Sequence, residues 1–289
     1  MRWIRIVAAT VGLAVGAWSA DASAFCRSTT CRKDCPTDID GCPETGLQLW
    51  WATSCIGYAL NKDLTQNLPP EPVRKALQAS FFAWADLDCG GGKRASITFT
   101  QLADAECKRS EYRTDAANVN VVLFKDDDWN YRGIDGTLAK TTVTFSAETG
   151  EILDADIEVN AAYNNLSVGD AKVEYDLQSI MTHEVGHLLG LAHTSDYTAT
   201  MYAAYEPGTT DLRVLKPDDL HAVCAVYPPG RKAACDPAPR GGLSLACPLP
   251  DAAKTGCSLA TTASDSGCYA PFSLLVLVAL GRRARRFGR

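Results

Sequence analysis

Alternating and clustered apolar residues predict a domain of strands and helices in the middle of this chain. Runs of β-branched or alternating apolar residues predict five strands, at residues 48–60, 95–100, 119–124, 137–145 and 152–159. Apolar residues at helical spacing predict three helices, at residues 72–87, 175–189 and 217–226. The expected fold class is therefore α+β, with one twisted, mixed and mostly parallel sheet of five strands.

The start of the chain has the pattern of a secretory signal peptide. Arg2 and Arg5 precede an apolar run at residues 6–18, and Ala22 to Ala24 form a small-residue cleavage site. The run is shorter than the roughly 20 residues that a membrane-spanning helix needs, so it does not predict an anchor. We expect residues 1–24 to be a signal peptide and the protein to be exported.

The composition changes again near the C-terminus. Residues 229–267 are rich in Pro, Ala, Gly and Ser, which indicates a linker or stalk that Cys235, Cys247 and Cys257 could crosslink. Residues 268–289 contain Cys268, an apolar run at 270–280 and five arginines. As a helix this run would rise about 16 Å, which is too short for a permanent membrane span. The segment resembles the C-terminal sorting tags of myxobacterial surface proteins, which implies sorting and processing machinery at the membrane as a partner.

The chain has 12 cysteines, and export favours disulfides for most of them. Disulfides are favoured over a zinc knuckle in the short segment 25–46, which contains Cys26, Cys31, Cys35 and Cys42. Cys89 is expected to pair with Cys107, since a Gly-Gly-Gly turn and one strand separate them. If Cys268 belongs to the tag, eleven cysteines remain, and one must be free, metal-bound or linked to another chain. A less favoured hypothesis is that a free thiolate of segment 25–46 binds the metal ion for which the histidines of residues 183–193 are candidate ligands.

Size and charge indicate one enzyme-sized domain and exclude one class of partner. The chain has 289 residues, of which 46% are hydrophobic, so residues 47–228 can bury a sizeable core. The net charge is −6, and no basic stripe is present inside this region, so nucleic acid is not expected as a partner. We expect a monomer.

Residues 183–193 read HEVGHLLGLAH and carry the strongest chemical signal. Residues four apart share one face of a helix, so His183 and His187 can bind one ion with Glu184 beside it. Gly190 ends the helix, and the turn brings His193 back as a third ligand. Three imidazoles suit Zn²⁺ and leave one coordination position for water.

The alternative for a short His-Glu-x-x-His pattern is chance on a solvated helix. Here the added Gly and third His make chance the weaker explanation. Three of the four histidines fall in this window. The fourth, His221, is expected to be an ordinary surface or helix-packing residue.

The extended motif resembles that of the metzincin metallopeptidases, and further segments resemble the matrixin type, peptidase M10. Met201 in ATMY resembles the Met-turn, and Thr194 is close to the Ser that follows the third His in matrixins. Other resembling segments cover about residues 47 to 228 and read VRKALQASFFAWADLDC, TLAKTTVTFSAETGEILDADIEVN and LKPDDLHAVCAVYPPG. Ala203 stands where astacins and serralysins carry a tyrosine ligand, so none is expected. The resemblance implies a zinc cleft between an upper and a lower subdomain.

The resemblance also implies roles for individual residues. Zn²⁺ would bind His183, His187 and His193, with Glu184 as the catalytic base and Met201 beneath the ion. Tyr202 and Tyr205 either line the S1′ pocket or pack as ordinary aromatics. A substrate backbone would add as a strand along Thr141 to Phe145.

Departures from the matrixin pattern leave some features open. The chain lacks the histidines of the family's second zinc site and the usual cysteine-switch motif. Structural Ca²⁺ is possible instead at Asp135, Asp154, Asp156 and Glu158, although carboxylates on a solvated strand face are the alternative. The sequence predicts an exported zinc endopeptidase acting on extracellular proteins or peptides, at the cell surface or outside the cell after C-terminal processing. The alternatives are an inactive binding or adhesion module and a hydrolase of other polymers such as cell-wall material.

Overall fold

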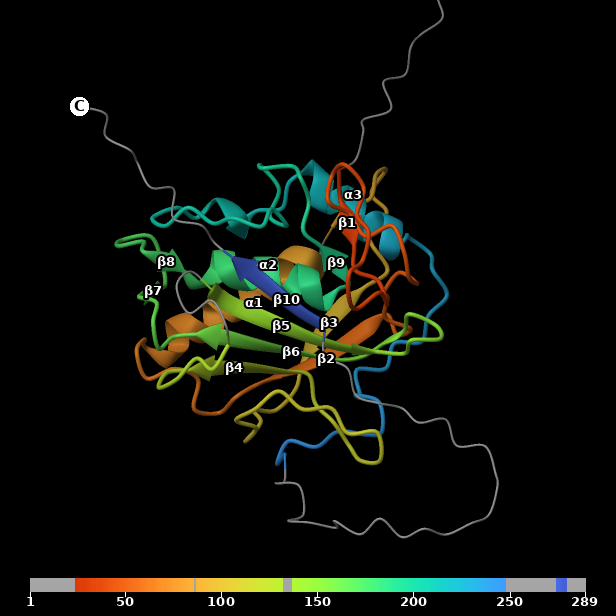
Figure 1. The fold of residues 1–289 in the computed structure, drawn as a ribbon. Helices are drawn as coiled ribbons and strands as arrows, with labels where there is room; N and C mark the ends of the chain where they lie inside the picture. The colour runs from red at the N-terminus through yellow and green to blue at the C-terminus, as the bar shows by residue number, and fades with distance from the viewer. Residues whose placement is uncertain (1–23, 86, 132–136, 248–273, 280–289) are drawn as a thin grey trace, which may run out of the picture.

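The computed structural model describes residues 24–85, 87–131, 137–247 and 274–279 (Figure 1). The predicted signal peptide, one calcium candidate and two cysteines lie outside the described residues, namely residues 1–23, Asp135, Cys257 and Cys268. Of the predicted sorting tag, 268–289, the structure describes only residues 274–279, so the tag and the cleavage site after Ala24 stay predictions. Among the described residues, no helix is both long enough and apolar enough to cross a bilayer.

One twisted sheet organises the domain (Figure 1). Its five main strands are β3, β2, β4, β6 and β5 in spatial order, and all neighbours are parallel except the antiparallel pair β5–β6. Their bounds are β2 (Cys55–Leu60), β3 (Thr98–Gln101), β4 (Val121–Lys125), β5 (Thr137–Phe145) and β6 (Ile152–Asn160). With three helices, this confirms the predicted α+β fold with a mixed five-stranded sheet.

A sixth strand lies on the free edge of β5. β10 (Leu274–Ala279) pairs antiparallel with β5, so that Leu274 is opposite Val143 and Ala279 is opposite Thr137. The sequence analysis assigned these residues to the apolar run of the sorting tag and did not predict a strand there. It shows that the β5 edge accepts an added strand, and in which direction that strand runs.

The helices are α1 (Pro70–Ala85), α2 (Leu177–Leu188) and α3 (Pro217–Val226). Short elements complete the domain: β1 (Cys26–Arg27), β7 (Leu166–Ser167), β8 (Tyr175–Asp176), β9 (Leu191–Ala192) and a 3-10 turn at Asp211–Arg213. The predicted helix from residue 175 begins later because the Asp176 carboxylate accepts from the Ser179 N–H at 2.8 Å and caps α2. The predicted strand 48–60 is regular only from Cys55, since Gln48 and Trp50 form isolated bridges.

The sheet has two differently covered faces, which we call the helix face and the loop face. Alternate residues of β4 show the division: Val122 packs into the main core with the helices, whereas Val121 and Leu123 belong to a smaller cluster on the opposite side. The helix face carries large buried side chains such as Phe81 and Trp84 of α1. The loop face is covered by irregular chain.

Part of the expected linker lies on the loop face. Cys55 is bonded to Cys235 and Cys107 to Cys247, so residues 229–247 are fastened to the domain. A Cβ on Gly57 would lie 2.0 Å from the Pro237 carbonyl oxygen, so glycine is needed where this segment crosses β2. This half of the segment therefore packs as part of the domain.

The predicted pairing of Cys89 with Cys107 is wrong. Cys89 is bonded to Cys224 of α3, and Cys107 to Cys247. Cys89 packs beside the core of the helix face and Cys107 lies in the cluster of the loop face, so the sheet separates them. The turn and strand between them suggested proximity, but the chain crosses to the other side of the sheet.

The N-terminal cysteines are also paired, Cys26 with Cys42 and Cys31 with Cys35. This pairing supports disulfides over a zinc knuckle and contradicts the hypothesis that a thiolate of segment 25–46 reaches the metal site. All ten cysteines among the described residues are in disulfides. The prediction of one odd cysteine now applies to Cys257, if Cys268 belongs to the tag.

Candidate metal centre

Helix α2 places two of the predicted ligands on one side. His183 and His187 are both buried, and their Nε2 atoms lie 3.1 Å apart. The helix is fixed at both ends: Asp176 caps its start, and the indole of Trp51 donates to the Leu188 carbonyl at 2.8 Å near its end. The position of both imidazoles therefore depends on a rigid element.

The turn after α2 brings in the third imidazole. Gly190 has φ +86°, and a Cβ there would lie 2.9 Å from the Leu49 carbonyl oxygen, so only glycine fits. β9 follows at once and leads to His193, whose Nε2 lies 3.2 Å from Nε2 of His187. The structure thus brings the three predicted histidines together.

The imidazoles are oriented by carbonyl groups behind them. Nδ1 of His183 lies 2.6 Å from the Thr200 carbonyl oxygen, and Nδ1 of His187 lies 2.9 Å from that of Leu191. A nitrogen facing a carbonyl must carry the proton, which leaves the Nε2 lone pair free for a metal. Burial lowers the pKa of His183 to about 3 and, for His193, to about 4, so both are neutral at pH 7. This donor set fits Zn²⁺.

Glu184 lies fully buried beside the histidines. Its Oε2 accepts a hydrogen bond of 2.5 Å from the hydroxyl of Thr141 on β5, while Oε1 has no partner among the described residues. Burial raises the pKa of Glu184 to about 8, and the Thr141 hydrogen bonds oppose this rise. One carboxylate oxygen is therefore fixed and the other is available for a reacting molecule.

Met201 packs against α2, and its expected position beneath a metal ion stays a prediction. A Cβ on Gly186 would lie 2.2 Å from the Met201 sulfur and 2.9 Å from the Trp84 ring, so the thioether and the indole both press on this glycine. The Met201 and Thr200 N–H groups donate to the Asp219 carboxylate at 3.0 and 2.8 Å. Asp219 therefore fixes the Met201 turn to α3.

The sequence analysis missed Thr141, Asp219 and Gly186 as residues that build this centre. Thr141 was noted only as part of a strand edge, because nothing in the sequence shows which helix residue lies beneath it. Asp219 belongs to the quoted Asp-Asp start of α3, so its position was visible but its role was not. Gly186 sits between the motif residues, where a side chain would collide with the turn below.

The other candidate side chains, Tyr205, Tyr202 and His221, differ in their burial. Tyr205 is buried, and its hydroxyl donates to the Thr209 carbonyl at 2.6 Å and accepts from the Asp176 N–H at 3.0 Å. Tyr205 thus holds the start of α2, and the Tyr202 side chain is half-buried. His221 is exposed on α3, as predicted.

Comparison with known proteins identifies the family. A family model described as Matrixin matches residues 50–228. The chain belongs to the matrixin family. It is similar to Metalloendoproteinase 1-MMP of Arabidopsis thaliana, with 29% identity over 190 residues that cover 64% of this chain and 46% of that protein. Neutrophil collagenase of Homo sapiens is 25% identical over 177 residues, which cover 61% and 33%. The chain spans less than half the length of these relatives.

In this matrixin the acidic residues of β6 face the loop face and are buried, not solvated. Asp156 accepts from the Val121 and Glu111 N–H groups, each at 2.9 Å, and Glu158 lies 3.2 Å from the Lys125 ammonium. Oδ1 of Asp154 has no partner among the described residues. Within those residues, the three histidines are the only group of three or more His, Cys, Asp or Glu residues whose ligand atoms all lie within 4.8 Å of one another.

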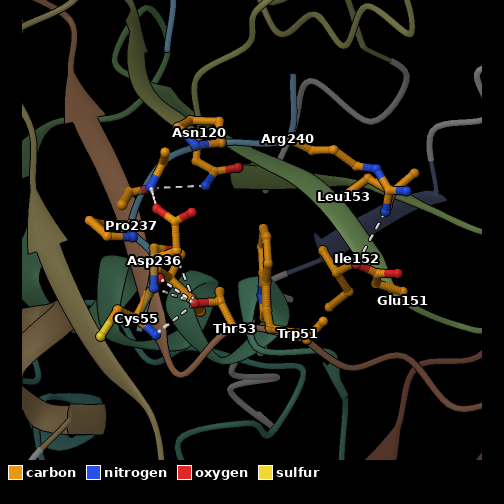
Figure 2. A pocket seen from close by; sticks show the side chains of 15 residues that line it. Trp51, Thr53, Cys55, Asn120, Glu151, Ile152, Leu153, Asp236, Pro237 and Arg240 are labelled. Atoms are coloured by element: carbon orange, nitrogen blue, oxygen red, sulfur yellow. Dashed lines mark hydrogen bonds and ion pairs between the residues drawn. The ribbon is translucent and has the colours of Figure 1, made fainter. Parts of the chain in front are cut away.

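One cavity lies away from the histidine cluster, under the fastened segment 229–247 (Figure 2). It has a volume of about 220 Å³ and is lined by Trp51, Asn120, Asp236 and other residues. Figure 2 shows Arg240 paired with Glu151 across one side, at 3.2 Å. No residue of the histidine cluster lines this cavity.

Proposed function

We propose that this matrixin is an exported zinc endopeptidase that hydrolyses peptide bonds of extracellular proteins or peptides. The observation that carries the proposal is the convergence of three neutral imidazoles beside a buried carboxylate with one unpartnered oxygen. Two of its relatives are named as a metalloendoproteinase and a collagenase, which supports the same reaction class. An inactive binding module is less well supported because Glu184 and all three histidines are present.

His183, His187 and His193 would hold the zinc ion, which supplies a Lewis acid that polarises the peptide carbonyl and makes a water molecule more acidic. The charge of a bound zinc ion would favour the ionised form of Glu184, which would take a proton from the attacking water with its free Oε1 and later give it to the departing amine. Thr141 keeps the other oxygen fixed, so that the carboxylate stays turned toward the reacting atoms.

The substrate backbone would bind as an added strand on the free edge of β5. The hydrogen bond from Thr141 of β5 to the Glu184 carboxylate supports this position, because it joins the strand to the proposed base. β10 supports the proposal because it already pairs with the same edge through backbone groups. A substrate can take this position only when β10 leaves it. Tyr202 stays a candidate for the S1′ wall, whereas the inward contacts of Tyr205 favour packing.

Export and structural calcium belong to the same proposal. The basic and apolar start of the chain and the five disulfides support an oxidising location outside the cytoplasm. Cell-surface sorting would follow from the Cys268 segment. Calcium is the weaker part, supported by the unpartnered oxygen of Asp154 but opposed by the partners of Asp156 and Glu158.

Chelator treatment of the purified full chain tests the proposal. We expect casein or gelatin cleavage to stop when a chelator removes the metal and to return when zinc is added, with one zinc per chain by elemental analysis. Calcium alone should not restore activity. If cleavage continued in the metal-free protein, or if the zinc-loaded protein cleaved cell-wall polymers and no peptide, the proposed function would be wrong.

A further inference from the structure

The disulfide-linked segment 25–46, which we call the N-terminal loop, lies beside the metal centre. β1 within it pairs antiparallel with β9, so that Cys26 is opposite Ala192, the residue before His193. The Ser28 N–H donates to the Gly190 carbonyl at 2.9 Å. The bond between Cys26 and Cys42 then holds the rest of the loop near this anchor.

The N-terminal loop touches both sides of the place where a peptide would lie. On the β5 side, the Arg32 guanidinium stacks over the ring of Phe145, the last residue of that strand, at 5.4 Å. On the side of the histidines, the Ser195 hydroxyl donates to the Asp40 carboxylate at 3.2 Å, two residues beyond His193. Arg32 and Asp40 therefore connect the loop to two segments that would flank a bound substrate.

The direction of a bound strand tells which part of a substrate meets the loop. β10 runs antiparallel to β5, with its first residue beside Val143 and its last beside Thr137. A peptide in the same position would point its N-terminal side toward Phe145 and the loop. Thr141 marks the position of Glu184 along β5, and four residues of strand from Thr141 to Phe145 span about 13 Å.

We propose that the N-terminal loop forms an end wall that limits a substrate to about four residues on the N-terminal side of the cleaved bond. This inference rests on the proposed peptidase function and deepens it. Short peptides, and flexible protein ends cleaved close to their N-terminus, would be preferred substrates, and the middle of a long extended chain would be cleaved more slowly. Two disulfides within the loop keep the wall rigid, so a longer peptide cannot simply push it aside.

A length series of peptides tests the end wall in the full chain. The peptides share one C-terminal half and carry two to eight residues before the cleaved bond, and kcat/KM is measured for each. For the parent, we expect kcat/KM to rise up to about four residues and then to fall about tenfold by eight. The double variant Arg32→Ala/Asp40→Ala should lose this fall. Lys33→Ala/Glu44→Ala removes the same two charges from exposed positions of the loop and should keep it.

Two further measurements keep the outcomes distinct. Ser195→Ala breaks the Asp40 contact from the domain side and should also relax the length limit, even if the double variant fails to fold. In the Glu184→Ala background, peptide Kd values should show the same length dependence without cleavage. An equal kcat/KM for all lengths in the parent, or the same fall in parent and double variant, would overturn the end wall while leaving the peptidase intact. Zinc-independent cleavage would instead overturn the peptidase function.

Discussion

The helix face of the sheet is covered by helices, whereas the loop face is covered by irregular chain. On the helix face, α1, α2 and α3 supply side chains at helical spacing, and the main core surrounds the histidine cluster. On the loop face, irregular segments cover a small apolar cluster, and disulfides to Cys235 and Cys247 hold the cover in place. The same face also buries Asp154, Asp156 and Glu158.

The contrast indicates that the helix face positions the candidate reactive groups, whereas the loop face is held to the sheet by disulfides. Regular elements fix atoms to within tenths of an ångström, which catalysis requires, and this explains why all three histidines come from α2 and the turn after it. Irregular chain has no ladder of backbone bonds to hold it, so crosslinks do so instead. Substitutions on the helix face should therefore change activity first, and substitutions on the loop face should change stability first.

The largest effect should come from Glu184→Ala on the helix face. Peptide cleavage should fall about 100- to 10,000-fold because the proton acceptor is gone. Zinc content should stay at one per chain, since the three imidazoles are untouched, and elemental analysis beside the rate assay checks this. Glu148→Ala removes an exposed carboxylate as the control and should retain full activity. Parent-like cleavage by Glu184→Ala would show that another group is the base.

On the loop face, Cys107→Ser/Cys247→Ser should show the opposite behaviour. The bond closes a loop with a sequence separation of 140 residues, so its loss should lower the free energy of unfolding by about 2–4 kcal/mol. Denaturant unfolding measures this change. Peptide cleavage at a temperature where the variant is folded should stay near that of the parent. An equal loss of activity in the folded variant would contradict the separation of the two faces.

A smaller effect on the helix face should follow from Thr141→Val. The substitution keeps the shape but removes the hydroxyl that fixes Oε2 of Glu184. We expect kcat to fall about tenfold, equivalent to about 1.4 kcal/mol, with KM nearly unchanged. Thr141→Ser should restore most of the rate because it retains the donor. If Ser and Val behaved alike, strand packing and not the hydrogen bond would explain the loss.

The same contrast explains what the sequence could predict. The helices of the helix face could be predicted from the spacing of their apolar residues. The HEVGHLLGLAH segment also predicts how its three imidazoles meet, because two share one face of a helix and a glycine turn brings in the third. Thr141 could not be found in this way, because its contact with Glu184 spans 43 positions and depends on how β5 crosses α2. The sequence pattern gives the strand but not its neighbour.

The loop face was predicted poorly for a related reason. Residues 229–247 have no period, so their composition indicated a linker, although two disulfides bind them to the sheet. The Cys89–Cys107 error has the same origin, since sequence proximity does not show on which side of the sheet a cysteine lies. Asp154 and Asp156 alternate with apolar residues and resembled a solvated face, but irregular chain buries them. Burial by a segment distant in sequence cannot be recognised from the local pattern of residues.

The smallest predicted effect concerns Asp154 on the loop face. Burial, and secondarily the nearby Asp156, raise the pKa of Asp154 well above its ordinary value of 3.8. The folded protein therefore keeps a proton that the unfolded chain releases above that pH, so the carboxyl makes folding less favourable as pH rises from about 4 toward neutrality. Asp154→Asn removes this pH-dependent cost.

We expect Asp154→Asn to raise Tm by a few degrees at pH 7, since about 1 kcal/mol corresponds to roughly 2–4 °C in a domain of this size. The gain should shrink as the pH is lowered to 4, where the carboxyl is protonated in both states. Asp127→Asn alters an exposed carboxyl and should leave Tm unchanged across the range. A gain of the same size at pH 4 and pH 7 would mean that amide packing, and not the buried proton, accounts for the change. If Asp154→Asn instead had a lower Tm than the parent at pH 7, and if calcium raised the Tm of the parent but not that of the variant, Asp154 would be an ion ligand. The loop face would then also hold a metal.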